Sequence, residues 1–170
     1  MPENKEDLHL RHSAYHESGH AVVALYIGCL VREAHIYDKR GDYAGDTKFD
    51  IRSKTKDNAD RKACIVGLSG PAAALKYDAR RDPRSSGDNK RVSRILRAFP
   101  ASDRPILYKE CKSKASEFVT LLWPQICEVA KALESKQADA TGKRILSQDE
   151  VVRIYESTSR DDGKEPRAAG

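Results

Sequence analysis

The chain has 170 residues and a net charge of +5 at pH 7; 34% of its residues are charged and 39% are hydrophobic. This length predicts one domain with its own core, and no apolar run approaches the 18 residues of a membrane span. The sequence contains no G-x-x-x-x-G-K-[ST] loop, so no ATP binding is expected. It also contains no C-x-x-C pair. Because the N-terminal residues also lack a signal-peptide profile, we expect a cytoplasmic protein whose four cysteines are reduced and mostly buried.

Hydrophobic periodicity predicts a mainly α, α+β fold in which a long helix precedes a small sheet. The first helix is expected over residues 10–27, with Gly28 placed to end it. Two strands are expected at 31–37 and 43–51, and Gly45 in the second is expected to mark a bulge.

The remainder of the chain is predicted to be helical with short interruptions. Pro71 is expected to kink the second helix, and Pro124 to divide a longer helical pattern. The segment Ser147–Glu150 matches a capping box that starts the last helix. The helices expected after the sheet are 56–78, 88–99, 105–136 and one that begins after the capping box. We place the domain at 1–158 and expect 159–170 to be a polar, disordered tail.

The strongest chemical signal is the motif H-E-x-x-H formed by His16, Glu17 and His20. Residues four apart on a helix differ by about 40° in direction and about 6 Å in height, so both imidazoles can reach one zinc ion. Glu17 lies one position off that line, where its carboxylate can accept a proton from a water on the metal. The motif therefore predicts a catalytic Zn²⁺ site, with one ion per chain.

A solvated, histidine-rich helix start is the alternative explanation of this motif. The residues that follow, 21–27, contain no charged side chain and are almost entirely apolar, so the helix is expected to enter the core. Buried polar side chains in such a helix need partners, and a metal ion provides them. The metal site is therefore the better explanation.

The third metal ligand must come from outside this helix. His12 lies on the same helical line, but residues i, i+4 and i+8 span about 12 Å, which is too far for one ion. The longer pattern H-E-x-x-H-x-x-G-x-x-H is excluded, because Val23 and Tyr26 stand where it needs glycine and histidine. The remaining candidates in the sequence are His35, Asp78, Asp82 and Asp88.

Residues 14–24 (AYHESGHAVVA) closely resemble the active-site helix of FtsH-type metallopeptidases, the protease domain of membrane-anchored AAA proteases. Residues 68–73 (LSGPAA) resemble the family's glycine-containing segment, and 86–88 (SGD) the segment that carries its third zinc ligand. Similarity to the C-terminal helices extends the resemblance over about residues 10 to 157. It implies a helical, zincin-like domain with a two- to three-stranded sheet, in which Asp88 is the third ligand.

The resemblance implies an ATP-independent zinc metalloendopeptidase that cleaves unfolded or flexible polypeptides, with His16, His20 and Asp88 as ligands and Glu17 as general base. One strand within 43–51 is expected to offer its edge to an extended substrate. The chain departs from the family at residues 73–75 (AAL), where a glutamate often follows the alanine pair. A contact that supports a metal ligand is therefore either absent or made by another group.

Two other functions are compatible with the sequence. A catalytically silent regulatory or protein-binding module would keep zinc as a structural staple, closed by a fourth protein ligand. A nucleic-acid-binding protein would use the basic residues of 76–97, but these lack interleaved aromatic residues, so a solvated face explains them better. An oligomer is compatible with the sequence but not indicated by it.

Overall fold

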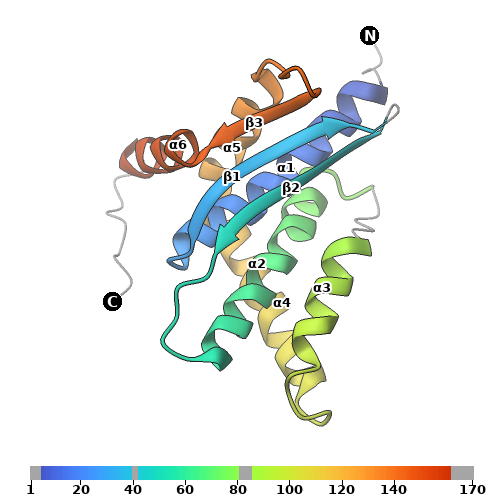
Figure 1. Ribbon diagram of the computed structural model, residues 1–170, viewed down its shortest axis with the longest axis vertical. Helices are drawn as coiled ribbons and strands as arrows, with labels where there is room; N and C mark the ends of the chain where they lie inside the picture. Colours follow the sequence, from blue (N-terminus) through green and yellow to red (C-terminus); the bar gives the residue numbers. More distant parts are fainter. Residues whose placement is uncertain (1–4, 40–41, 81–85, 162–170) are drawn as a thin grey trace.

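The computed structural model describes residues 5–39, 42–80 and 86–161. These residues form a mainly helical structure with a small three-stranded antiparallel sheet, which confirms the predicted fold class. The elements in chain order are α1 (Lys5–Tyr26), β1 (Leu30–Asp38), β2 (Tyr43–Asp50), α2 (Lys56–Tyr77), α3 (Ser86–Leu96), α4 (Arg104–Leu121), α5 (Trp123–Ser135), β3 (Lys143–Ser147) and α6 (Gln148–Asp161) (Figure 1).

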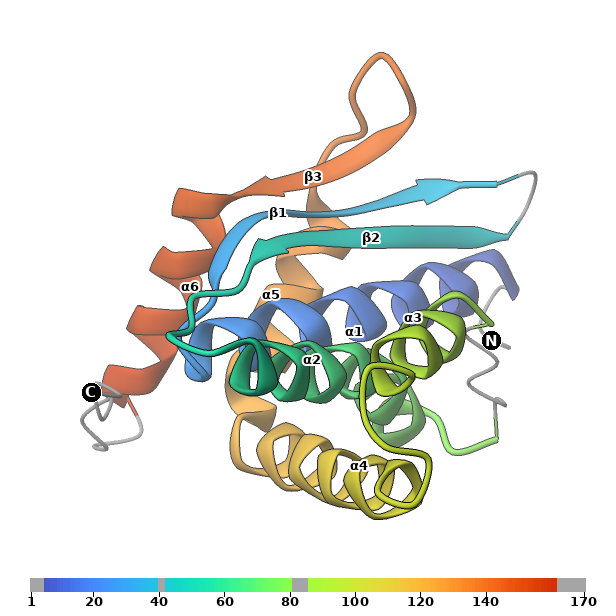
Figure 2. The same ribbon diagram turned by 60° about the horizontal axis from the view of Figure 1, so that its bottom comes forward.

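The sheet lies across α1, and most of the helices lie on the other side of α1 from the sheet (Figure 2). Helix α1 packs against β1 and β2 on the sheet side and against α2 and α5 on its other sides. Helix α4 covers α2, and α3 packs beside α2 below the edge of β2. The motif-bearing helix is therefore the central element of the fold.

Residues 17–24 of α1 are all buried, which accounts for the apolar run that begins at Ala21. The side chains from Ala21 to Ala24 have no exposed surface. The helix ends where Gly28 adopts a left-handed conformation (φ +78°). The N–H groups of Gly28 and Cys29 then donate to the carbonyls of Leu25 and Ala24, at 3.0 and 2.8 Å, as in a Schellman motif.

The strand order in the sheet is β2-β1-β3, so β2 is an edge strand. The third strand, β3, is an element for which the sequence offered no individual signal. The expected bulge at Gly45 is wrong, because Gly45 pairs in regular register with Ile36. The irregularity lies instead on β1, between Val31 and Glu33. Gly45 is needed for a different reason, namely its contact with α1 described below.

Pro71 does not end its helix, whereas Pro124 and the capping box at Ser147 mark helix boundaries as predicted. Pro71 lies inside α2, which continues to Tyr77, whereas α4 ends at Leu121 and α5 begins at Trp123, so Pro124 divides that pattern as predicted. Ser147 and Glu150 form the expected capping box: the Glu150 side chain accepts the Ser147 N–H at 2.9 Å, and the Ser147 hydroxyl oxygen accepts the Glu150 N–H at 3.4 Å.

The C-terminal helix is longer than the sequence suggested. Helix α6 continues to Asp161, so the first residues of the predicted tail, 159–161, are helical. Ser159 is buried and lies 3.4 Å from the amide nitrogen of Gln125. The remainder of the predicted tail, 162–170, lies outside the described residues.

Two hydrophobic clusters stabilise this arrangement. The larger one joins α1, the sheet, α5 and α6, and the smaller one joins α2, α3 and α4 through Cys64, Val92 and Leu107. Helix α3 contributes Val92 and Leu96 to the smaller cluster, and both are buried. In the part of the chain that the structure describes, none of the helices combines the length and the apolar character needed to cross a membrane.

Candidate metal centre

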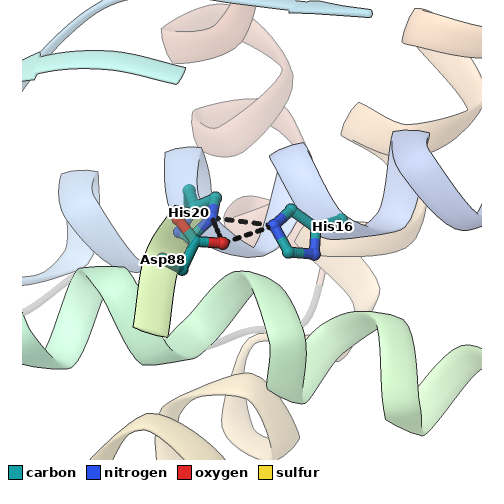
Figure 3. Close-up of side chains that lie close together, drawn as sticks. All are labelled: His16, His20 and Asp88. Atoms are coloured by element: carbon teal, nitrogen blue, oxygen red, sulfur yellow. Dashed lines mark hydrogen bonds and ion pairs between the residues drawn. The ribbon is translucent and has the colours of Figure 1, made fainter. Parts of the chain in front are cut away.

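His16 and His20 point to the same side of α1, as their four-residue spacing requires. Their Nε2 atoms lie 3.1 Å apart (Figure 3). Asp88 comes from α3, 72 residues after His16, and its Oδ2 lies 2.8 Å from the Nε2 of His16 and 3.3 Å from that of His20. The fold thus brings three donor atoms together from two helices that are distant in sequence.

The separations between these three atoms fit a tetrahedral metal ion. Ligand atoms about 2.0–2.1 Å from zinc in tetrahedral geometry are about 3.3 Å from each other, and the observed separations are 2.8 to 3.3 Å. Two imidazoles and one carboxylate form a ligand set known from catalytic zinc sites. Among residues 5–39, 42–80 and 86–161, only His16, His20 and Asp88 form such a group.

The tautomer of His20 also fits metal binding. Its Nδ1 lies 2.7 Å from the carbonyl oxygen of Val66 on α2. A carbonyl oxygen only accepts hydrogen bonds, so Nδ1 donates its proton there. In the neutral ring, Nε2 then presents its lone pair to Asp88 and His16, which is the arrangement that metal-binding histidines usually have.

The charge balance of the cluster favours a cation. Burial raises the pKa of Asp88, but its hydrogen bonds with His16 and His20 lower it further, so the net pKa lies well below its usual value. Burial lowers the pKa of His20, whereas Asp88 and the Glu17 carboxylate raise it, to about 9. The surroundings therefore stabilise positive charge between these residues, whether a proton on His20 or a bound cation carries it.

Glu17 is buried beside the two histidines and is held by the edge strand of the sheet. Its side chain accepts a hydrogen bond from the Thr47 hydroxyl at 2.8 Å, and the same hydroxyl lies 3.1 Å from the backbone oxygen of Glu17. Burial raises the pKa of Glu17, while the histidines and Thr47 partly oppose this increase. A carboxylate with a raised pKa is a better proton acceptor than one in water.

Gly45 allows β2 to approach Glu17 closely. A Cβ atom at Gly45 would lie 2.5 Å from Cγ of Glu17 and 2.6 Å from the backbone oxygen of His35. Both distances are shorter than real carbon contacts, so any larger residue at Gly45 displaces either Glu17 or the strand.

Two further glycines set the distance between α1 and α2. A Cβ atom at Gly70 would lie 2.2 Å from Nε2 of His20, so the imidazole occupies the space of the missing side chain. At Gly19 a Cβ atom would lie 2.6 Å from Cβ of Ala73 and from the carbonyl oxygen of Ser69. These contacts give a physical role to residues 68–73: they let α2 pack against the motif, and the same packing brings the Val66 carbonyl to His20.

The other candidates for a third ligand lie elsewhere. His35 is buried in β1, with Nδ1 3.3 Å from Glu33 Oε1, and does not belong to the cluster. Asp78 ends α2 and pairs with Arg80 at 3.0 Å. Asp82 lies outside the described residues. His12 does not join the group, in agreement with the distance argument.

The helix that carries Asp88 begins two residues earlier than the expected range of 88–99. Helix α3 begins at Ser86, so Asp88 lies inside the first turn and is not the N-cap residue of this helix. Its side chain is directed at the histidines, and 20% of it is exposed, compared with 16% for His16 and 7% for His20. Solvent therefore reaches the cluster mainly on the side of His16 and Asp88.

Several residues that complete the site were missed in the sequence. Thr47, which holds Glu17, and Val66, which orients His20, carry no recognisable motif. Gly45 and Gly70 were visible as glycines inside regular elements, a pattern that often marks the close approach of another group. That signal was available, but it does not reveal which group approaches.

No protein-family model matches this chain, and no curated protein has a significant match to it. Conclusions about its chemistry therefore depend on the arrangement of the residues described above.

Proposed function

We propose that the chain is a zinc-dependent metalloendopeptidase that cleaves unfolded or flexible polypeptides without ATP. The observation that carries this proposal is the convergence of His16, His20 and Asp88 beside the buried Glu17. Three protein donors and a neighbouring carboxylate are the residues that metal-assisted hydrolysis of a peptide requires.

Each residue has a separate role in this mechanism. His16, His20 and Asp88 would hold the zinc ion, which when bound polarises the peptide carbonyl and acidifies water. Glu17 accepts a proton from the attacking water and transfers it to the leaving amine. Thr47 keeps the Glu17 carboxylate in place during both transfers, because its hydroxyl donates to Oε2.

The edge strand β2 supports a preference for extended substrates. Within the described part of the chain, β2 has a strand neighbour, β1, on one side only. It also holds Glu17 through Thr47, so a polypeptide that pairs with its free edge lies next to the proposed catalytic groups. A folded substrate cannot present such an extended segment, which explains the proposed preference for unfolded chains.

The resemblance to FtsH-type peptidases supports the same proposal. The motif residues 14–24 and the segments around Gly70 and Asp88 are the parts of the sequence that resemble this family, and they all contribute to the cluster. This chain contains no G-x-x-x-x-G-K-[ST] loop, and we propose that its own cleavage reaction needs no nucleotide.

The alternative is a silent module in which the metal is only a structural staple. Such a site is closed by four protein ligands, and in residues 5–39, 42–80 and 86–161 the group contains three. The buried position of Glu17, whose carboxylate accepts a hydrogen bond from Thr47, also favours catalysis over a purely structural site.

Metal analysis combined with casein digestion, with and without ATP, tests the proposal. We expect one zinc per chain and ATP-independent cleavage in the wild type. Glu17→Gln should keep zinc but lose cleavage, while Asp88→Ala should lose affinity for zinc. Glu156→Gln, a matched change at an exposed residue of α6, serves as the control and should retain both properties. Full proteolysis by Glu17→Gln would contradict the mechanism.

A further inference from the structure

Helix α3, which carries Asp88 of the proposed catalytic centre, has a basic face on its solvent side. We call Lys90, Arg91 and Arg94 of α3, together with Arg97 in the turn that follows it, the basic face; all four are exposed. The single acidic residue of α3, Asp88, points toward the histidines instead. The helix thus presents a carboxylate to the centre and an uninterrupted positive charge to solvent.

The charges of the basic face are not neutralised by the described carboxylates. Lys114, Lys131 and Arg61 on other helices each pair with a carboxylate within 4.0 Å. No such pair joins any residue of the basic face to a carboxylate within 5–39, 42–80 or 86–161. Interaction of Arg94 with the C-terminal end of the helix dipole explains one cation in the last turn, but not the other three.

Arg91 links the basic face to the edge strand. Its Cζ lies 5.5 Å from the ring centroid of Phe49 on β2. Figure 1 shows α3 on the side of β2 that faces away from β1, which is the side of the free edge. Because Asp88 and Arg91 are about one turn apart, Arg91 stands beside any chain that pairs with this edge near the centre.

The face is also hollowed. Asn89, Lys90, Ser93, Arg94 and Arg97 line an open hollow of about 410 Å³. A polypeptide that passes Arg91 from the edge strand and continues around α3 therefore meets further positive groups and space.

We propose that the basic face selects polypeptide substrates that carry acidic residues on one side of the cleaved bond. This inference deepens the proposed peptidase function and rests on it. The complementary partner of four cations that no described carboxylate neutralises is an anionic chain, and a polypeptide is the chain that β2 can bind through its backbone. Residues 90–97 contain no aromatic side chain on which a nucleic-acid base can stack.

The positions of Thr47 and Phe49 along β2 predict how far from the cleaved bond the acidic residues of the substrate lie. Phe49 lies two residues beyond Thr47, which holds Glu17, and two strand residues span roughly 7 Å. Arg91 therefore contacts substrate positions roughly two to four residues from the cleaved bond, and on one side only.

Two sets of three flexible peptides, otherwise identical in sequence, test the proposal. Each set carries Glu, Gln or Lys at those positions, before the cleaved bond in one set and after it in the other. Cleavage is measured with the zinc-loaded full chain, and binding with zinc-loaded Glu17→Gln by fluorescence anisotropy. The KM and Kd of the Glu peptide should be about 3- to 10-fold lower than those of the Gln peptide. This difference should occur only when the Glu residues lie on one particular side of the cleaved bond, and it should shrink with added salt.

The double variant Arg91→Gln/Arg94→Gln should reduce the preference for the Glu peptide over the Gln peptide to less than about 2-fold. The control Lys109→Gln/Lys112→Gln removes the same charge from exposed positions of α4 and should keep the preference. Equal loss in both variants, or an unchanged preference in the first, would overturn the proposal.

Separate measurements of binding and of cleavage distinguish a failure of this inference from a failure of the proposed function. If no peptide is cleaved but Glu17→Gln still binds the Glu peptide through Arg91 and Arg94, the peptidase function fails and the acidic-chain site stands. If duplex DNA or phosphatidylserine vesicles bind through these arginines and the Glu peptide does not, the selection of acidic polypeptides is overturned.

Discussion

The hydroxyl of Thr47 on β2 contacts Glu17 on α1 twice, at 2.8 Å from the carboxylate and 3.1 Å from the backbone oxygen. This contact joins the edge of the sheet to the helix that carries the zinc motif. The strand proposed to bind substrate and the residue proposed to accept a proton are therefore positioned by one side chain.

Thr47→Val keeps the shape of this side chain but removes its hydrogen bond. The Glu17 carboxylate then loses its partner in a buried site, so we expect it to rotate and turnover to fall by about 10- to 100-fold. The zinc content should not change, because Thr47 does not contact His16, His20 or Asp88. Thr47→Ser retains the hydroxyl and should recover most of the turnover; a Val variant as active as the Ser variant would refute this role.

Gly70→Ala should weaken zinc binding. The new Cβ lies 2.2 Å from Nε2 of His20, so the imidazole has to move away from Asp88. We expect an affinity for zinc reduced by about 10- to 100-fold, measured by competition with a chelator. Gly87→Ala is the matched control, because a Cβ there meets nothing within 4 Å; equal affinities in both variants would show that His20 does not depend on Gly70.

Zinc should stabilise the folded chain through the three converging residues. At a free zinc concentration of 100 times Kd, binding adds about 2.7 kcal/mol to the free energy of unfolding and raises Tm by roughly 5 to 10 °C. His16→Gln should abolish most of this increase. His9→Gln, on the same helix but paired with Asp42, should retain it; an unchanged zinc effect in His16→Gln would argue against this cluster as the binding site.

The capping box of α6 predicts a pH-dependent contribution to stability. Lys136 and the Ser147 N–H lower the pKa of Glu150 to about 2. Because the folded pKa is below the unfolded value, of about 4.3, the stabilisation is complete above about pH 5 and is lost as the pH falls toward 2. The free energy of unfolding in urea should be about 1 kcal/mol higher for the wild type than for Glu150→Gln at pH 7.

The same urea series at decreasing pH provides the check on sign. The difference between wild type and Glu150→Gln should shrink steadily between about pH 5 and pH 2. A difference that stays constant or grows in acid would mean that the ionised Glu150 does not stabilise the cap.

Local signals in the sequence were sufficient for most of the helices. Gly28 ends α1, Pro124 separates α4 from α5, and Ser147 with Glu150 starts α6, as the residue types predict. Each of these signals acts within about four residues, so it needs no knowledge of distant parts of the chain. Strand β3 was missed because its five residues form a strand by pairing with β1, more than 100 residues earlier.

The sequence alone determined that His16 and His20 face the same direction, because a spacing of four residues in a helix fixes their relative orientation. It left His35, Asp78, Asp82 and Asp88 as alternatives until a family resemblance selected Asp88. Only the tertiary structure decided which residues meet the motif, since packing of α3 and α2 against α1 depends on many side chains at once. That packing brings Asp88 to the histidines, Thr47 to Glu17 and the Gly70 backbone to His20.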